Sequence, residues 1–158
     1  TVKDSGGVTF IPALSGLGAP YWNPKATGSI LGITRGTEKG HIARAALEGI
    51  AIRTYEIIKN MQKDANTQFT NLKVDGGASN NNLLMQIQSN LIEANVIRPV
   101  ITETTALGVG FLAGLGSGYW KSIEDLKNIW KHDRKFIPEI SNKENILSKW
   151  KETINVLY

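Results

Sequence analysis

The sequence of 158 residues contains no cysteine. Disulfide frameworks, cysteine zinc sites and thiol nucleophiles are therefore excluded, and a reducing, cytoplasmic environment is expected. No apolar run approaches the roughly 20 residues that a membrane span requires, so no membrane partner is expected. Residues 1–5 show neither an initiator Met nor a cationic or apolar leader, which we interpret as a cut inside a longer polypeptide.

Charge of one sign is not concentrated anywhere along the chain. The net charge is +4, from 18 Lys and Arg against 14 Asp and Glu. Basic residues outnumber acidic ones by 10 to 8 in residues 1–120 and by 8 to 6 in residues 121–158. Proteins that grip phosphate backbones normally gather basic residues on one face, so no nucleic-acid partner is expected. The composition, 41% hydrophobic and 20% charged, is typical of one globular domain.

The spacing of apolar residues predicts alternating strands and helices. Short β-branched or apolar runs predict strands at 8–14, 29–34, 72–75 and 96–100. Helical spacing predicts helices from a Thr37 cap to about 62, from about 80 onward, and at 106–116, 123–130 and 143–157. This alternation implies parallel strands in an α/β fold. Four strands are few for so many helices, so we expect upstream strands to complete the sheet.

Two of the helices carry a further expectation about packing. The helix that follows Thr37 has one apolar stripe, expected to face the core, made of Ile42, Ala46, Ile50, Ile57 and Met61. The 106–116 helix is rich in Gly and Ala, which lowers its intrinsic helix propensity. Small residues of this kind predict a close approach to a sheet or to another helix.

The sharpest local pattern is the run from Leu72 to Asn81, in which a short strand leads into Gly76 and Gly77 and a helix follows directly. Glycines at the carboxyl end of a strand allow a ligand to lie against the backbone, and a helix N-terminus presents free N–H groups. An Asn at the helix start either caps the helix or reaches the amino edge of a ligand. The pattern alone favours a tight strand-to-helix turn with an Asn cap over a ligand site, because two adjacent glycines are a weak signal.

Other candidate residues have weaker patterns. Asp75 and Glu103 follow strands, where open α/β sheets place their sites, but no partner for a general base is visible, and Asp75 is interpreted as structural. His41 and His132 have no second ligand at metal spacing. The loop 15–24 holds two aromatics between prolines, which predicts a core plug or the wall of a cleft. The sequence shows no Walker loop and no Ser-His-Asp arrangement.

Several segments taken in order resemble the FGGY carbohydrate kinase family over nearly the whole chain. The segment 28–33 and, after seven residues, the segment 41–48 are similar to a signature of that family at every position. The segments 15–22, 74–78 and 104–108 also match. The run Gly-Leu-Gly-Ala-Pro-Tyr-Trp in the first of these resembles members that phosphorylate glycerol more than those acting on xylulose, ribulose or gluconate.

The resemblance implies a two-domain actin-like ATPase fold of ribonuclease-H-like topology, with a mixed sheet flanked by helices, that closes on ATP. Residues 1–158 would be most of the C-terminal domain and its nucleotide-binding half, without the N-terminal domain. The implied activity is ATP-dependent phosphorylation of glycerol to glycerol 3-phosphate. Gly77 would contact the nucleotide through its backbone, Gly76 would permit the turn, and Asn81 would lie beside the adenine amino edge.

The resemblance also implies that other parts of the machinery lie upstream of Thr1. These are the catalytic Asp that accepts the glycerol proton, the glycerol contacts, and the glycine hairpins that hold phosphates and Mg²⁺. No catalytic residue or metal ligand is therefore expected in this chain, which would be inactive alone. The whole protein would be a cytoplasmic homo-oligomer that binds glycerol and ATP. An actin-like binding or assembly module without phosphoryl transfer is the alternative.

Overall fold

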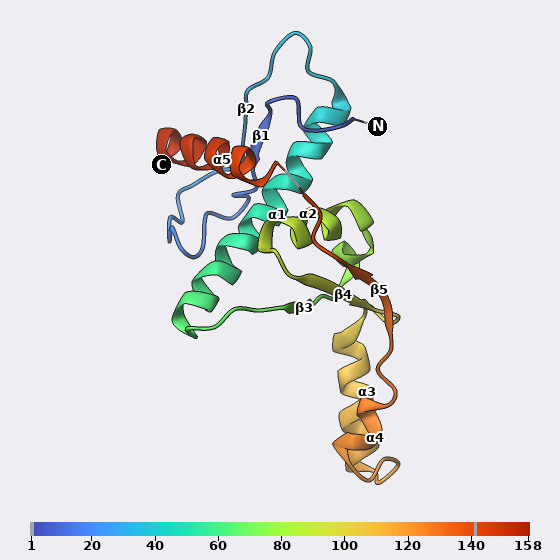
Figure 1. Ribbon diagram of the computed structural model, residues 1–158. Helices are drawn as coiled ribbons and strands as arrows, with labels where there is room; N and C mark the ends of the chain where they lie inside the picture. The colour runs from blue at the N-terminus through green and yellow to red at the C-terminus, as the bar shows by residue number, and fades with distance from the viewer. Residues whose placement is uncertain (1, 141) are drawn as a thin grey trace.

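The computed structural model describes residues 2–140 and 142–158 and is drawn in Figure 1. Its strands are β1 (Thr9–Ile11), β2 (Ser29–Leu31), β3 (Asn71–Lys73), β4 (Asn95–Pro99) and β5 (His132–Phe136). Its helices are α1 (Lys39–Asp64), α2 (Asn82–Ile92), α3 (Thr104–Gly116), α4 (Ile123–Lys127) and α5 (Lys143–Leu157), with a 3-10 turn η1 (Gly77–Asn80). No helix in this part of the chain is long and apolar enough to cross a membrane.

A three-stranded sheet, ordered β3-β4-β5, supports α2, and α1 packs against α2. The central strand β4 is parallel to β3 and antiparallel to β5, with Val96 opposite both Leu72 and Phe136. Val96 and Phe136 are almost completely buried, as is Leu91 of α2. The expected α/β class, with a mixed sheet flanked by helices, is confirmed.

A glycine in α1 allows this helix to pack directly on β1. A Cβ at Gly49 would lie 2.2 Å from the carbonyl oxygen of Phe10, closer than side chains approach backbone. β1 pairs antiparallel with β2, with Phe10 opposite Ile30. Helix α5 lies beside these elements (Figure 1) and contributes Trp150, which is buried and donates its indole N–H to Glu56 Oε1 of α1 at 2.9 Å.

The N-cap of α1 lies one residue later than predicted. Glu38 is the N-cap residue, and its N–H donates to His41 Nδ1 at 3.0 Å. The hydroxyl of Thr37 instead accepts the N–H of Thr34 at 2.9 Å, so it closes the preceding turn. The Thr37 hydroxyl thus bonds the turn before the helix, and Glu38 takes the cap position predicted for Thr37.

The apolar stripe predicted for α1 is wrong for three of its four large members. Ile50, Ile57 and Met61 are 42%, 44% and 51% exposed. The buried face instead combines small, apolar and polar side chains: Ala45, Glu48, Gly49, Ala51, Ile52, Ile58 and Gln62. Small residues allow close packing on β1, and the buried Glu48 carboxylate is satisfied by Arg44 Nε at 2.7 Å. Hydrophobic periodicity cannot reveal a face of this kind.

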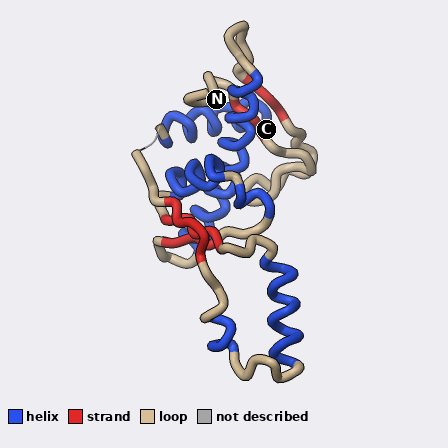
Figure 2. Tube along the Cα trace, turned by 90° about the vertical axis from the view of Figure 1, so that its right-hand side faces the viewer, coloured by secondary structure: helices blue, strands red, loops and turns tan. Residues whose placement is uncertain are grey.

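The predicted close approach of α3 to a sheet or to another helix is wrong. None of its residues is buried, and α3 and α4 project together from the rest of the molecule (Figures 1 and 2). Its one close approach is at Gly114, where a Cβ would lie 2.2 Å from the ring of Trp120. The Trp120 ring also meets Phe111 edge to face, with ring centroids 5.4 Å apart. Small residues here serve a local turn, while Val109 and Leu112 are exposed.

Strand β5 occupies a segment that the sequence analysis did not predict as regular structure. The first four residues of β5, His132 to Lys135, are polar and exposed, and only Phe136 is buried. Pairing with β4 therefore creates this strand, because its own composition has no strand pattern. In contrast, α5 spans the predicted 143–157 without a change at either end.

Candidate functional site

The predicted motif forms a tight turn at the carboxyl end of β3. Backbone pairing continues one residue beyond this strand, since the N–H of Val74 donates to the carbonyl of Ile97 at 3.1 Å. Gly76 then adopts a φ of +76°, a left-handed conformation that favours glycine. Its N–H donates to the carbonyl of Thr102 at 2.8 Å, which ties the turn to the segment after β4. The turn therefore lies where two parallel strands end side by side.

Gly77 begins η1, and the space beside it is free of described protein atoms. A Cβ added at Gly76 or Gly77 would meet no heavy atom of the described chain within 4 Å. The φ of Gly77 is not positive, so its backbone conformation is open to any residue. The missing side chain at Gly77 leaves the exposed backbone at the strand end open to a ligand, and this fits an approach by a flat or extended molecule.

Asn81 is the N-cap of α2. Its Oδ1 accepts the N–H of Leu84 at 3.0 Å, and the α-helix begins at Asn82 after the 3-10 turn. The side-chain amide nitrogen donates no hydrogen bond to the described residues, and a second lone pair of Oδ1 is available. The three predicted site residues, Gly76, Gly77 and Asn81, thus lie within one turn of six residues. Asn81 caps the helix and keeps groups with which it can bond a ligand.

A residue of the central strand, not predicted from the sequence, also supports this turn. Arg98 of β4 is only 9% exposed, and its Nη1 donates to the carbonyl of Ser79 and to Asn82 Oδ1, both at 2.9 Å. Its Nε and Nη2 donate to Asp133 Oδ2 of β5 at 2.9 and 2.6 Å. The one available signal was an arginine inside the otherwise apolar run 96–100.

The two acids at the strand ends have local roles. Asp75 accepts the hydroxyl of Thr104, so it joins the turn after β3 to the first residue of α3. Glu103 is the N-cap residue of α3, and its side chain makes no capping hydrogen bond. Neither acid has the buried or paired environment of a general base. The interpretation of Asp75 as structural agrees with this contact.

Neither histidine belongs to a metal site in the described chain. His41 accepts the N–H of Glu38 in the first turn of α1, as described above. His132 lies on β5 opposite Pro99 and is exposed. Residues 2–140 and 142–158 include no group of three or more His, Cys, Asp or Glu side chains that could hold a metal ion.

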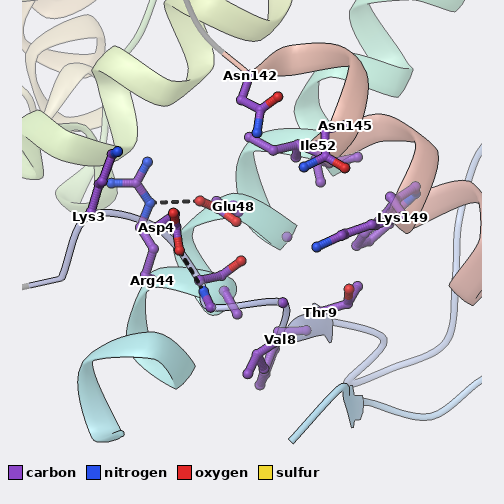
Figure 3. A pocket seen from close by; sticks show the side chains of 18 of the residues that line it. Lys3, Asp4, Val8, Thr9, Arg44, Glu48, Ile52, Asn142, Asn145 and Lys149 are labelled. Atoms are coloured by element: carbon purple, nitrogen blue, oxygen red, sulfur yellow. Dashed lines mark hydrogen bonds and ion pairs between the residues drawn. The ribbon is translucent and has the colours of Figure 1, made fainter. Parts of the chain in front are cut away.

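A cavity of about 610 Å³ lies away from the turn, between the N-terminal segment, α1 and α5. Figure 3 shows Arg44 and Glu48 joined on one side of it, and Lys149 reaching toward it from α5. Asn142 and Asn145 add amide groups from the beginning of α5. None of the motif residues lines this cavity, so it is not part of the predicted site.

The loop 15–24 is held to α1 by Glu56 and by Arg53, whose Nη2 donates to the carbonyl of Ala19 at 2.7 Å. Glu56 accepts hydrogen bonds from the Tyr21 hydroxyl and from the Trp150 indole, and its other oxygen accepts from Arg53 Nη1 at 2.5 Å. Burial, followed by the hydrogen bond to Glu56, raises the pKa of Tyr21 to about 12. Tyr21 thus plugs the loop onto α1, while Trp22 is 77% exposed.

Comparison with known proteins relates the whole chain to one family. Residues 1–117 match the model of the C-terminal domain of the FGGY family of carbohydrate kinases. A glycerol kinase of Saccharolobus islandicus is 54% identical over 156 residues, which are 98% of this chain and 31% of that protein. A glycerol kinase of Deinococcus radiodurans is 50% identical over the same shares. The chain therefore spans about a third of the length of the curated relatives it matches.

Solved structures show the same fold. The Plasmodium falciparum glycerol kinase with ADP superposes with a TM-score of 0.86 at 34% identity, over 99% of this chain and 32% of that one. A ligand-bound xylulose kinase from Lactobacillus acidophilus superposes with a TM-score of 0.80 at 25% identity, over 97% of this chain and 32% of that one. The mixed sheet with its flanking helices is thus the arrangement found in these sugar kinases.

Proposed function

Because this chain belongs to the FGGY family of carbohydrate kinases, we propose that the protein of which it is part phosphorylates glycerol with ATP. The products would be glycerol 3-phosphate and ADP. Support for glycerol as the substrate comes from the glycerol kinases that are 50% to 54% identical to this chain. The likeness to a glycerol kinase with ADP supports a nucleotide as the second substrate.

The open turn from Gly76 to Asn81 is the observation that carries the role of this chain. The backbone at Gly77 has no side chain and no described neighbour on its free side. Asn81, four residues further on, offers amide groups that the helix cap does not use fully. We therefore propose residues 1–158 as a C-terminal domain that supplies the adenosine-binding half of the cleft, with Gly76, Gly77 and Asn81 as its nucleotide contacts.

The chemical step would take place against groups of the remaining protein. A glycerol hydroxyl oxygen forms the new bond to the γ-phosphorus of ATP, the bond to the bridging oxygen breaks, and ADP leaves. The hydroxyl proton passes to an aspartate that we place in the preceding part of the polypeptide. We place the Mg²⁺ ion that accompanies ATP there as well. This chain contributes binding and orientation, which are the main requirements of phosphoryl transfer.

Further properties of the whole protein follow from the same proposal. The use of ATP and the absence of cysteine both fit a cytoplasmic protein. We propose no nucleic-acid or membrane partner. A homo-oligomer is the proposed state.

The relatives do not favour an actin-like assembly module without phosphoryl transfer. A module that had lost its nucleotide would not need an open backbone at Gly77. The similar proteins that cover almost the whole chain are named as kinases.

The test is an assay of the full-length protein with purified substrates. Formation of glycerol 3-phosphate from ATP and glycerol is expected, with much slower turnover of gluconate, xylulose and ribulose. The variant compared with the wild type is Gly77→Val, which should reduce turnover at low ATP concentration. A full-length protein that binds ATP and turns over none of these alcohols would contradict the proposed activity and return the assembly module to consideration.

A further inference from the structure

A buried arginine links the turn at the strand ends to two neighbouring strands. Arg98 lies on the central strand β4 with a side chain that is 11% exposed. Its guanidinium donates four hydrogen bonds, two toward the turn, at Ser79 and Asn82, and two toward Asp133 of β5. All four donor–acceptor distances lie between 2.6 and 2.9 Å, within the range of well-formed charge-assisted hydrogen bonds.

The two contacts toward the turn lie on either side of Asn81. One holds the backbone carbonyl of Ser79, two residues before it, and the other holds the side chain of Asn82, directly after it. Other anchors of the turn are made by backbone groups and by helix α2: the N–H of Gly76 donates to Thr102, the Ser79 hydroxyl donates to the Gly76 carbonyl at 2.7 Å, and Asn81 caps the buried helix α2. The Arg98 guanidinium adds the side-chain hydrogen bonds that tie the residues on both sides of Asn81 to the central strand.

We propose that Arg98 is a positioning residue for the nucleotide. It fixes the backbone that contains Gly77 and the side chain of Asn81 relative to the strand ends, and it does not itself touch the ligand. This inference rests on the proposed function, because it assigns to Arg98 the geometry of the site proposed there. A displacement of about 1 Å in such a site is enough to lower reaction rates about a hundredfold.

Arginine suits this place for geometric reasons. Its planar fork presents donors in two directions, so one side chain bonds the turn on one edge and the Asp133 carboxylate on the other. A lysine ammonium at the same place has a single nitrogen and could not span both groups. Asp133 supplies the negative charge that a buried guanidinium needs. Strand β5 thus contributes to the site through its charge, although it lies outside the motif.

The experiment compares two arginines of the full-length protein. Arg98 and Arg134 face each other across β4 and β5, and both guanidinium groups lie over the Phe136 ring, at 5.6 and 4.9 Å. Only Arg98 bonds the turn. Arg98→Met should raise the dissociation constant of ATP, titrated without glycerol, by roughly two- to twelvefold, as expected for the loss of one neutral hydrogen bond to the ligand. The KM for glycerol should change less than twofold, and Arg134→Met should leave both constants unchanged.

A gentler variant keeps the test valid if Arg98→Met fails to fold. Asn82→Ala removes one acceptor of the guanidinium at an exposed position and leaves the ion pair with Asp133. It should weaken ATP binding in the same direction, by a few-fold, without changing the glycerol KM. Arg98→Lys should keep the fold and still bind ATP weakly, since it keeps the charge and loses the fork.

Two outcomes separate this inference from the proposed site. The inference is overturned if Arg98→Met folds and binds ATP with wild-type affinity. If Arg98→Met does not fold, wild-type ATP affinity in Asn82→Ala overturns it. If Gly77→Val weakens ATP binding in the same experiment, the proposed nucleotide site stands without Arg98. If Gly77→Val also binds ATP normally, the proposed site itself is wrong. Weaker ATP binding in both Arg98→Met and Arg134→Met would mean a general effect on the sheet and would likewise overturn the inference.

Discussion

Asn81 combines two roles that substitution can separate. In the structure its Oδ1 accepts the N–H of Leu84 at 3.0 Å, and in the proposed site the same side chain meets adenine. Serine is as good an N-cap as asparagine, but it lacks the amide and the reach. Asn81→Ser therefore keeps the cap and removes the ligand contact, whereas Asn81→Ala removes both.

The loss of the helix cap is measured as a change in stability, and the loss of the ligand contact as a change in ATP affinity. Losing the cap should lower the free energy of unfolding by about 0.5–2 kcal/mol in Asn81→Ala and by much less in Asn81→Ser. Losing a neutral hydrogen bond to the base should weaken ATP binding by about 0.5–1.5 kcal/mol in both variants. With 1.4 kcal/mol for each factor of ten, the dissociation constant rises roughly two- to twelvefold.

The assay is titration of ATP and GTP against the full-length wild type and both variants, with chemical denaturation of each. The preference for ATP over GTP should narrow in both variants, because guanine carries a carbonyl where adenine has its amino group. Wild-type nucleotide affinity in Asn81→Ser, together with lowered stability in Asn81→Ala, would refute the ligand contact and leave Asn81 as a helix cap only.

Two other predictions concern the loop 15–24 and the isolated chain. Because the pKa of Tyr21 is raised to about 12 in the folded protein, the unfolded chain loses this proton first, and stability should fall as the pH rises from 10 toward 12. Denaturation measured across that range should show the fall, and it should be smaller in Tyr21→Phe; equal slopes would contradict it. The isolated 158-residue chain should bind a hydrophobic dye through exposed groups such as Val109 and Leu112 and should form no glycerol 3-phosphate. A dye-free monomer with a sharp thermal transition, or product above a control without enzyme, would contradict these expectations.

Local signals in the sequence were sufficient for the elements that stabilise themselves. Helix α5 has an amphipathic repeat over its whole length, and its predicted bounds are those of the structure. The turn after β3 was also recognisable, because Gly76 and Gly77 follow an apolar strand and Asn81 precedes a helical repeat. In these cases the residues that decide the conformation are neighbours in the sequence.

Long-range packing explains what the sequence did not predict. Strand β5 exists because β4 offers it an edge, since only Phe136 of its five residues is buried. The exposed Ile57 of α1 lies on a face that the apolar repeat assigned to the core, while Gly49 packs on β1 instead. The support of the turn by Arg98 joins residues 19 and 35 positions apart, so no local pattern could contain it.

The turn from Gly76 to Asn81 as the adenosine contact is tested most directly at Gly77. Its φ is not positive and a Cβ meets no described atom within 4 Å, so Gly77→Val should fold with a stability within about 0.5 kcal/mol of the wild type. The new side chain would occupy the space proposed for the nucleotide, at a cost of about 1–3 kcal/mol, or roughly a five- to 150-fold rise in the ATP dissociation constant. The decisive measurement is ATP titration of the full-length Gly77→Val protein beside its KM for glycerol. The account predicts weakened ATP binding with an unchanged glycerol KM. A folded Gly77→Val protein that binds ATP as tightly as the wild type would contradict it.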